Sequence, residues 1–374
     1  MPREDAAKLK DWFDREAAIR LAAQIRAVRP DFDSERYVRL ASRGLQELEF
    51  KDRVEKFAWA LKETLPQHLP TALAVLTESL PEPLVDCESP TDGWLQWPIG
   101  EFIALYGLPH FEDSFEAMYA LTQRFTAEYA LRPFLEHYPE ETLSVLSDLV
   151  DDESPHVRRF CSEAVRPRLP WAKVVNFLVE DPEPVLPILE ALMDDPELYV
   201  RRSVANNLND ISKDHPNLVV DLCRHWWEPE NEERVWLITH ALRGLIKSAH
   251  PGALSLLGFF TPPPELKVKL DIEPPEVRMG EMVKFKATLQ NRSSKPLKLQ
   301  VDFVLHLVRS QGASSGKVFK WKALVLEPGR QVTLPKKHPM KKTTVRALYP
   351  GVHRVELQVN GVRLGRGEFL LKEF

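Results

Sequence analysis

Basic and acidic side chains recur at a fixed spacing in two similar segments of the chain. The arginine pairs Arg158/Arg159 and Arg201/Arg202 lie 43 positions apart, and an acidic residue follows each pair. A carboxylate at a reacting centre can stabilise developing positive charge or position a water, and an arginine can bind a phosphate. A 43-residue period is typical of HEAT-like helical repeats, which stack into a solenoid with one continuous concave face.

Helical geometry predicts which of these side chains share a face. At about 100° of rotation per residue, the apolar residues of both segments gather on one side. We expect the opposite side to carry Arg159 and Glu163 in the first segment, Arg202, Asn206 and Asp210 in the second, and Arg243 and Lys247 in a third segment of the same pattern, residues 235–248. Three stacked helices would then present a carboxylate, an amide with a carboxylate, and two cations.

Each candidate also fits an ordinary structural role. Glu163 is spaced to form a surface ion pair with Arg159, as most such acids do. Asp210 could cap a turn near a helix end, and Glu128 could pair with a neighbouring arginine. Trp171 follows a proline, where a tryptophan usually packs between helices.

Residues 1–258 are predicted to be almost entirely helical. Apolar residues recur with the helical period, and prolines mark the turns between helices. Before the three repeated segments, we expect helices over residues 12–28, 34–64, 69–80, 94–108 and 113–138.

Three consecutive prolines in residues 259–265 indicate a stiff linker. After it, apolar and polar residues alternate with the period of strands in residues 266–272, 282–291, 297–308, 317–326, 352–360 and 362–374. Asn360-Gly361 is a strong hairpin signal. About seven strands in roughly 110 residues predict an immunoglobulin-like sandwich. The predicted fold is mainly α: a HEAT-like helical-repeat solenoid (1–258), the linker (259–265) and an all-β immunoglobulin-like sandwich (266–374).

The composition of the 374 residues, 44% hydrophobic and 28% charged, is ordinary for a soluble globular protein. No apolar run approaches the roughly 20 residues that cross a bilayer, and the charged N-terminus does not resemble a signal peptide. Three widely spaced cysteines favour a reducing compartment. We therefore expect a cytoplasmic protein, with no demand for more than a monomer. No Cys-x-x-Cys or His-Glu-x-x-His sequence occurs, so we expect neither a metal site nor a cofactor.

The net charge of −5 hides a strong asymmetry. Residues 265–374 contain 22 basic and 10 acidic side chains, against 28 and 45 in the remainder. A positive excess over a whole domain favours a module that binds a polyanion over a merely solvated surface. The densest basic run, expected to form a loop between strands, contains Lys336, Lys337, Lys341, Lys342 and Arg346.

The helical part resembles the AlkC family of DNA alkylation-repair glycosylases. The matching stretches are WPIGEFIALYGL (97–108), LTQRFTAEYALRPFL (121–135), VRRFCSEAVRPRLPW (157–171) and YVRRSVANNLNDISKDHP (199–216). The resemblance covers about the whole chain, including an immunoglobulin-like appendix found in a subset of the family. Together these motifs are specific, although each alone is weak.

The resemblance implies a monofunctional DNA glycosylase that excises the cationic bases 3-methyladenine and 3-methylcytosine without flipping them into a deep pocket. It places catalytic carboxylates at Glu128, Glu163 and Asp210, and an aromatic that contacts the lesion region at Trp171. Departure of a cationic base leaves an oxocarbenium-like sugar, which carboxylates stabilise. The implied partner is double-stranded DNA with alkylated bases, bound at the nucleoid. From the positive excess of residues 265–374 we expect the sandwich to clamp the duplex from the side opposite the helices.

Periodicity alone favours a different function. HEAT-like arrays are commonly non-catalytic scaffolds that bind nucleic acid or protein. The two hypotheses differ in one observable, the release of a base from methylated DNA.

Overall fold

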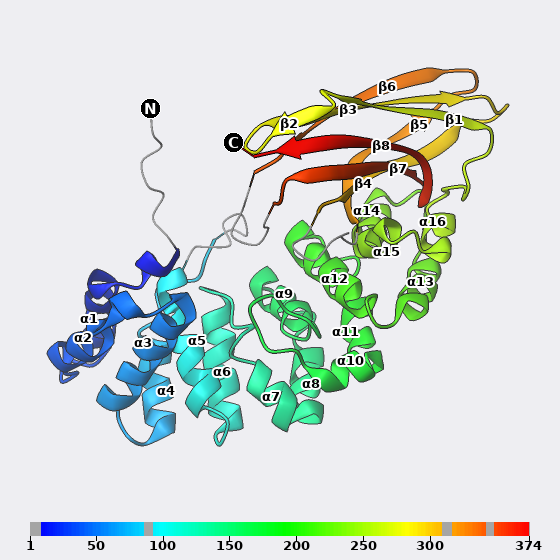
Figure 1. Ribbon diagram of the computed structural model, residues 1–374. Helices are drawn as coiled ribbons and strands as arrows, with labels where there is room; N and C mark the ends of the chain where they lie inside the picture. The colour runs from blue at the N-terminus through cyan, green and yellow to red at the C-terminus, as the bar shows by residue number, and fades with distance from the viewer. Residues whose placement is uncertain (1–8, 86–92, 309–315, 342–347, 374) are drawn as a thin grey trace. The chain divides into compact units, whose positions relative to one another are not determined.

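The computed structural model describes residues 9–85, 93–308, 316–341 and 348–373 (Figure 1). The chain forms two compact units, one of residues 1–214 with 228–241 and one of residues 215–227 with 242–374. The first unit is helical, and the second combines three helices with all the described strands. The predicted class, mainly α followed by a β-sandwich, is confirmed. The structure changes from helix to strand between Leu256 and Leu266, while the domain boundaries at residues 258 and 266 remain a prediction.

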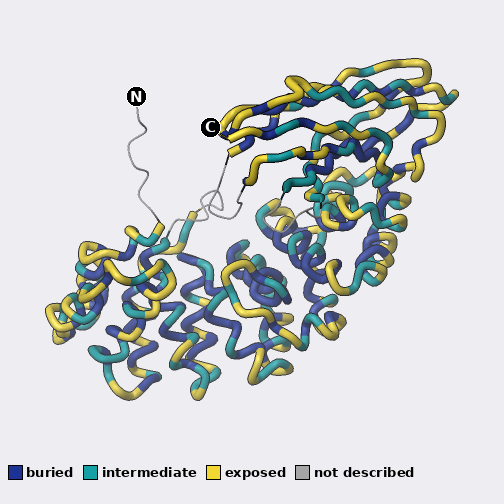
Figure 2. The backbone as a smooth tube through the Cα atoms, viewed as in Figure 1, coloured by how far each residue is buried: buried dark blue, intermediate teal, exposed yellow. Residues whose placement is uncertain are grey.

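The first unit stacks its helices largely in chain order, so that each packs against its neighbours. Its α-helices are α1 (Arg15–Val28), α2 (Ser34–Ser42), α3 (Phe50–Thr64), α4 (Leu69–Glu78), α5 (Trp97–Tyr106), α6 (Phe111–Thr122), α7 (Arg132–His137), α8 (Pro139–Asp148), α9 (Pro155–Glu163), α10 (Asn176–Glu180), α11 (Leu186–Ala191), α12 (Leu198–Ile211) and α14 (Glu232–Ala241). Contacts between α6 and α9, α9 and α12, and α12 and α14 continue the stack. Figure 2 shows buried residues along the helices of this unit. None of the described helices is both long and apolar enough to span a membrane.

Three predicted helices are in fact broken, although no proline marks two of the breaks. The segment 34–64 divides at Gly44, whose left-handed backbone (φ 76°) ends the helical path. The segment 113–138 divides into α6, which ends at Thr122, and α7, which begins at Arg132 with Pro133 in its first turn, a position that needs no backbone N–H. The segment 235–248 divides at Leu242 into α14 and α15 (Arg243–Lys247), which belong to different units.

The 43-residue repeat is visible in equivalent hydrogen bonds. The Arg158 guanidinium donates to the backbone oxygens of Asp152 and Glu153, at 2.8 and 3.0 Å. Arg201 donates to the oxygens of Asp195 and Pro196, 43 positions on, at 2.5 and 2.8 Å. The first arginine of each pair therefore fastens the loop before its own helix.

The second unit contains a two-sheet sandwich. Its strands are β1 (Leu266–Glu273), β2 (Glu276–Arg278), β3 (Met282–Asn291), β4 (Leu297–His306), β5 (Lys317–Leu326), β6 (Gln331–Pro339), β7 (Gly351–Val359) and β8 (Val362–Lys372). One sheet has the order β1-β3-β6 and the other β2-β8-β7-β4-β5. Apolar side chains such as Phe285, Phe303 and Leu357 fill the core between the sheets. The sequence analysis missed β2, which is short, and β6.

The sandwich is tied to the helices of its own unit, α13 (Pro216–His225), α15 and α16 (Pro251–Leu256). The predicted Asn360-Gly361 hairpin joins β7 to β8, and both residues have positive φ. The Asn360 amide donates to the backbone oxygen of Phe260 at 2.9 Å, and Lys298 Nζ donates to that of Leu257 at 2.8 Å. These bonds fix the end of the helical segment to the sandwich.

Candidate active site

A chain of alternating carboxylates and cations crosses the helices α9 and α12 and the loops beside them. This charge cluster consists of Glu128, Arg159, Glu163, Arg166, Asp210 and Lys213. Its three carboxylates are nearly buried, with exposed fractions of 5%, 5% and 2% in sequence order. The sequence analysis expected Glu163 and Asp210 on an exposed polar face, and burial in ion pairs corrects that expectation. The structure nevertheless brings together the three predicted carboxylates and Arg159.

Arg159 joins the first two carboxylates of the cluster. Its guanidinium forms an ion pair with Glu128, from the segment before α7, and lies 3.5 Å from Glu163 Oε1. It also donates to Thr126 Oγ1 at 2.7 Å and lies over the Tyr199 ring, 5.3 Å from the ring centre. These contacts hold the side chain in one place, so Arg159 is a fixed positive charge between two negative ones.

Arg166 joins the second carboxylate to the third. Its NH1 donates to Glu163 Oε1 at 2.5 Å, and its Nε donates to Asp210 Oδ2 at 2.8 Å. Ser203 Oγ donates to the other oxygen of Glu163 at 2.7 Å, and Lys213 Nζ lies 2.7 Å from Asp210 Oδ1. Every carboxylate in the cluster therefore has at least one cation within bonding distance.

The environment pushes the pKa values of two neighbouring carboxyl groups in opposite directions. Burial, together with the negative charge of Glu163, raises the pKa of Glu128 despite its contact with Arg159. Burial would also raise the pKa of Glu163, but Arg159, Arg166 and the Ser203 hydroxyl outweigh it and lower that pKa. A carboxylate with a raised pKa accepts a proton more readily, whereas one with a lowered pKa stays ionised.

Trp171 lies in the loop after α9 and is 51% exposed. Its backbone is left-handed (φ 68°), a conformation that is uncommon for a residue with a bulky side chain. The indole packs against the Phe50 ring with 5.5 Å between ring centres and against Trp97 with 6.3 Å. Tyr129, next in sequence to Glu128, stacks on Trp97 at 5.1 Å. Trp171 thus presents an aromatic surface supported by other rings, rather than filling a core.

The other predicted helical site residues lie apart from the cluster's ion pairs. Arg202 is exposed, and no described residue forms an ion pair with it. Arg243 and Lys247 belong to α15, which is separate from α14 and part of the second unit, so the predicted single helix over residues 235–248 is wrong. A shared face of these cations with Glu163 and Asp210 stays a prediction. The positive charge of Lys247 acts on the carboxyl group of Asp302 in β4, whose pKa burial raises.

The basic run is not the loop that the sequence suggested, since Lys336 and Lys337 lie in β6 and pair with β3. Lys336 Nζ donates to the Lys320 oxygen at 3.3 Å and lies over the Phe303 ring. Lys337 stands directly opposite Lys284, a like-charge pair that costs stability. Lys341 follows the strand and is exposed. Lys342 and Arg346 lie outside the described residues.

Several residues around the site were not singled out from the sequence. Thr126 and Ser203 bond to the cluster, Phe50 and Trp97 pack against Trp171, and Tyr129 stacks on Trp97. Phe50 comes from α3, more than 100 positions before Trp171, so no local spacing could have linked them. Arg166 lies within the stretch VRRFCSEAVRPRLPW (157–171), and this motif was the signal available for it.

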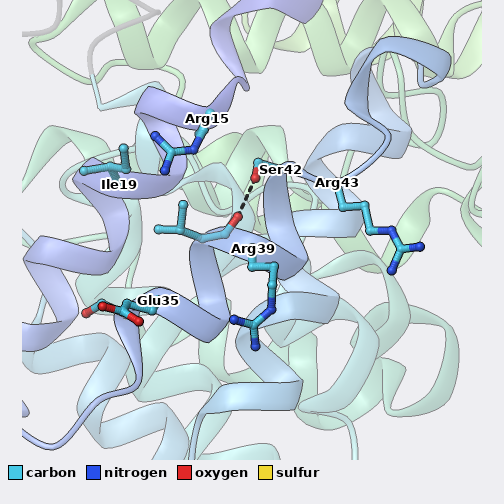
Figure 3. Close-up of a pocket in the computed structure, with 8 residues that line it drawn as sticks. Arg15, Ile19, Glu35, Arg39, Ser42 and Arg43 are labelled. Atoms are coloured by element: carbon cyan, nitrogen blue, oxygen red, sulfur yellow. Dashed lines mark hydrogen bonds between the residues drawn. The ribbon is translucent and has the colours of Figure 1, made fainter.

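A groove of about 700 Å³ lies on α1 and α2 (Figure 3). Its lining includes three arginines but one carboxylate, Glu35. In Figure 3 the side chains of Arg39 and Arg43 extend in different directions. The groove contains no member of the charge cluster, so its residues offer no paired carboxylates for acid–base or charge-stabilising chemistry.

Comparisons with known proteins agree with this geometry. Residues 122–224, which include the three carboxylates and Trp171, match a family described as DNA alkylation repair enzyme. Residues 267–373 match a family described as the C-terminal Ig-like domain of the uncharacterised protein YhaZ. The chain is 34% identical to the uncharacterized protein YhaZ of Bacillus subtilis, over 95% of this chain and 97% of that protein.

A solved structure extends the match to three dimensions. It is the alkylpurine DNA glycosylase AlkC of Pseudomonas fluorescens, bound to DNA containing an abasic site analog. Its sequence is 37% identical, the match covers 98% of this chain and all of that one, and the TM-score is 0.91. On these grounds, the chain belongs to the AlkC family of DNA alkylation-repair glycosylases.

Proposed function

We propose that this protein is a monofunctional DNA glycosylase that releases 3-methyladenine and 3-methylcytosine from double-stranded DNA. The observation that carries the proposal is the charge cluster, in which two arginines join Glu128, Glu163 and Asp210 into one buried network. The half-exposed Trp171 lies in the same loop as Arg166 of this network. The family match and the similarity to a DNA-bound alkylpurine glycosylase support the same activity.

The chemistry requires little more than well-placed negative charge. N3-methylation makes the base cationic, so the glycosidic bond breaks with its electron pair leaving on the base. The sugar then resembles an oxocarbenium ion, which an adjacent carboxylate stabilises before water adds to C1′. No covalent enzyme intermediate is needed, because the base is already a good leaving group.

The opposite pKa shifts suggest a division of roles within the cluster. Glu163, whose pKa is lowered, remains ionised and stabilises the positive sugar together with Asp210. Glu128, whose pKa is raised, is the better proton acceptor and takes the proton from the attacking water. Arg159 and Arg166 keep the three carboxylates in place without contributing a nucleophile.

The C-terminal sandwich has a different role in the proposal. Lys284 and Lys337 are exposed like charges on neighbouring strands, with Glu273 opposite Lys284 on its other side. A phosphate beside Lys337 would relieve the repulsion between the two lysines. Together with the exposed Lys341, this pair offers a basic surface suited to the phosphates of a duplex. Lys342 and Arg346 belong to the same basic run of the sequence but lie outside the described residues. We infer that this surface binds the DNA on which the helical unit acts, with Arg202, Arg243 and Lys247 as further cations for the backbone. Arg159 is instead held in ion pairs with Glu128 and Glu163. The enzyme would act as a monomer on nucleoid DNA in the cytoplasm.

The decisive experiment measures released bases. DNA treated with a methylating agent is incubated with the protein, and the free bases are separated and quantified. Release of 3-methyladenine or 3-methylcytosine above the spontaneous rate supports the proposal. Tight binding to methylated DNA with no release would instead support the non-catalytic scaffold.

A further inference from the structure

Arg132 is a buried arginine whose guanidinium bonds to backbone rather than to acid. The residue is 5% exposed and begins α7. It donates from NH1 to the backbone oxygens of Ala164 and Arg166, at 2.9 and 2.7 Å, and from NH2 to that of Lys173 at 2.8 Å. Within the described residues it forms no ion pair with a carboxylate. A buried charge without an ionic partner is costly, so its three carbonyl contacts need a reason.

Those three carbonyls belong to one loop. Residues 164–173 follow the end of α9 and contain no regular helix. Other bonds also fix the loop: Val175 N donates to the Pro167 oxygen at 3.1 Å, Ala172 N donates to the Leu169 oxygen at 3.2 Å, and the side chains of Arg166 and Arg168 pair with Asp210 and Asp214. Arg132 contacts both the start and the end of the loop, so it holds the two ends together.

The same loop carries two residues of the candidate site. Arg166 joins Glu163 to Asp210, and Trp171 presents the exposed aromatic surface. The Trp171 backbone is in a left-handed conformation that its surroundings must enforce. The place of both side chains relative to the carboxylates therefore depends on how the loop is closed.

The chemistry of arginine suits this task better than that of lysine. A planar guanidinium donates several hydrogen bonds in fixed directions and can reach three carbonyls at once. Ala164 caps α9, where unpaired carbonyls and the helix dipole favour a cation. Burial lowers the pKa of Arg132 to about 10, which still leaves the side chain protonated near neutral pH.

We propose that Arg132 is a positioning residue for excision: by closing the 164–173 loop, it sets the place of Trp171 and Arg166 against the carboxylates. This role requires no contact between Arg132 and DNA or the reacting sugar. This inference rests on the proposed glycosylase function for its kinetic part, but not for its structural part.

The test uses the full-length protein with Arg132→Gln and Arg132→Lys. The matched control is Arg201→Gln, because Arg201 is also 5% exposed and also donates to two backbone oxygens, but of the loop before α12. Hydrogen–deuterium exchange over residues 164–175 is expected to speed up in Arg132→Gln, less in Arg132→Lys, and not in Arg201→Gln. This measurement needs no activity. Unchanged exchange in Arg132→Gln would overturn the proposal even if the protein proves not to be a glycosylase.

The kinetic arm measures the single-turnover rate constant for release of 3-methyladenine at saturating enzyme. A displacement of roughly 1 Å at a positioned group can cost about 10²-fold, so Arg132→Gln should lose at least about tenfold. The rate constant of Arg201→Gln should stay within about threefold of the wild-type value. Both variants are measured at temperatures equally far below their unfolding midpoints. If Arg132→Gln loses no more than Arg201→Gln, the role is merely structural and the proposal is wrong.

A double-mutant cycle with Trp171→Ala tests the route of the effect. If Arg132 acts through the loop, Arg132→Gln should cost much less in the Trp171→Ala background than in the wild type. Full additivity would overturn the proposed route. A wild-type protein that releases no alkylated base would count against the proposed function alone, since the exchange experiment decides the structural part separately.

Discussion

Replacing Glu163 by glutamine is the sharpest test of the charge cluster. The amide has nearly the same shape and can still accept the hydrogen bond from Ser203. It removes one negative charge between Arg159 and Arg166. The cluster has three carboxylates against two arginines and one lysine, so the substitution changes its formal charge from 0 to +1.

The expected loss of rate follows from that charge. A unit charge about 6 Å from the reacting sugar, at an effective dielectric constant of about 20, contributes roughly 3 kcal/mol. This corresponds to about a 10²-fold lower single-turnover rate constant. The fold should survive, because Arg159 keeps Glu128 and Arg166 keeps Asp210 as partners. The cost in free energy of unfolding should therefore stay below the roughly 3–5 kcal/mol of an orphaned buried charge.

The assay is release of 3-methyladenine under single-turnover conditions, with DNA affinity and unfolding measured on the same preparations. Asp195→Asn is the matched control, since Asp195 is 6% exposed and paired with Arg158 but lies outside the cluster. We expect the control to lose stability with little loss of rate constant. If Glu163→Gln excises within threefold of the wild type while remaining folded, the electrostatic role assigned to this carboxylate is refuted.

Four further predictions follow from the same structure. Because the pKa of Glu128 is raised above its ordinary value of 4.5, the excision rate constant of the wild type should already fall on acidification before pH 4.5 is reached. Glu128→Gln should be slower at every pH and should not show this acidic decrease. The pKa of Glu163 is shifted in the opposite direction, so its ionised form stabilises the folded protein fully above pH 4.5, and this stability is lost as the pH falls through the lowered pKa of the folded state. The difference in free energy of unfolding between wild type and Glu163→Gln should therefore shrink in that range, and denaturant titrations at several pH values would measure it. Neutral lesions such as uracil and hypoxanthine should not be released, and efficient excision of uracil from a duplex would contradict selection by lesion charge. The double charge reversal Lys337→Glu with Lys341→Glu should weaken duplex binding by at least about tenfold, measured by fluorescence anisotropy, whereas Lys269→Glu, in the same sheet beside Asp271, should have a smaller effect.

The structure changes how the sandwich should be tested. Ending the chain at Thr261 looks from the sequence like a clean removal of a basic module. The bonds from Asn360 to Phe260 and from Lys298 to Leu257 show that the helices of the second unit share contacts with the strands. Truncation would therefore disturb α16, and the charge reversals isolate the role of the basic surface better.

Regular periodicity made most of the fold predictable from the sequence. Strands β3 and β5 begin and end where alternation predicted, and the repeat at Arg158 and Arg201 recurs in the hydrogen bonds. The breaks at Gly44 and Leu242 were missed because the apolar pattern continues across them. Strand β6 was missed because its lysines and Pro335 suggest a loop, although an edge strand tolerates both.

The site was predictable only in part. Motifs of the family pointed to Glu128, Glu163, Asp210 and Trp171, and the structure brings these carboxylates into one network. Helical angles alone placed Glu163 and Asp210 on a solvated face, since they do not reveal what covers that face. Arg166 covers both carboxylates, and it comes from an irregular loop rather than from a helix. A projection of one helix cannot show such contacts between repeats.

The alternation of signs in the charge cluster has a consequence for how the protein approaches its substrate. A bare group of three carboxylates would repel a phosphate backbone over a distance of several ångströms. Here each carboxylate has a cation beside it, so the electrostatic potentials of the two charges cancel at long range. The potential of a single carboxylate acts only on a group in direct contact with it. Ions in solution screen charges over about 10 Å at ordinary ionic strength, but hardly at all inside a buried cluster. Added salt should therefore leave bond cleavage in the bound complex almost unchanged, and any effect of salt on DNA capture should come from the basic surface of the sandwich rather than from this cluster.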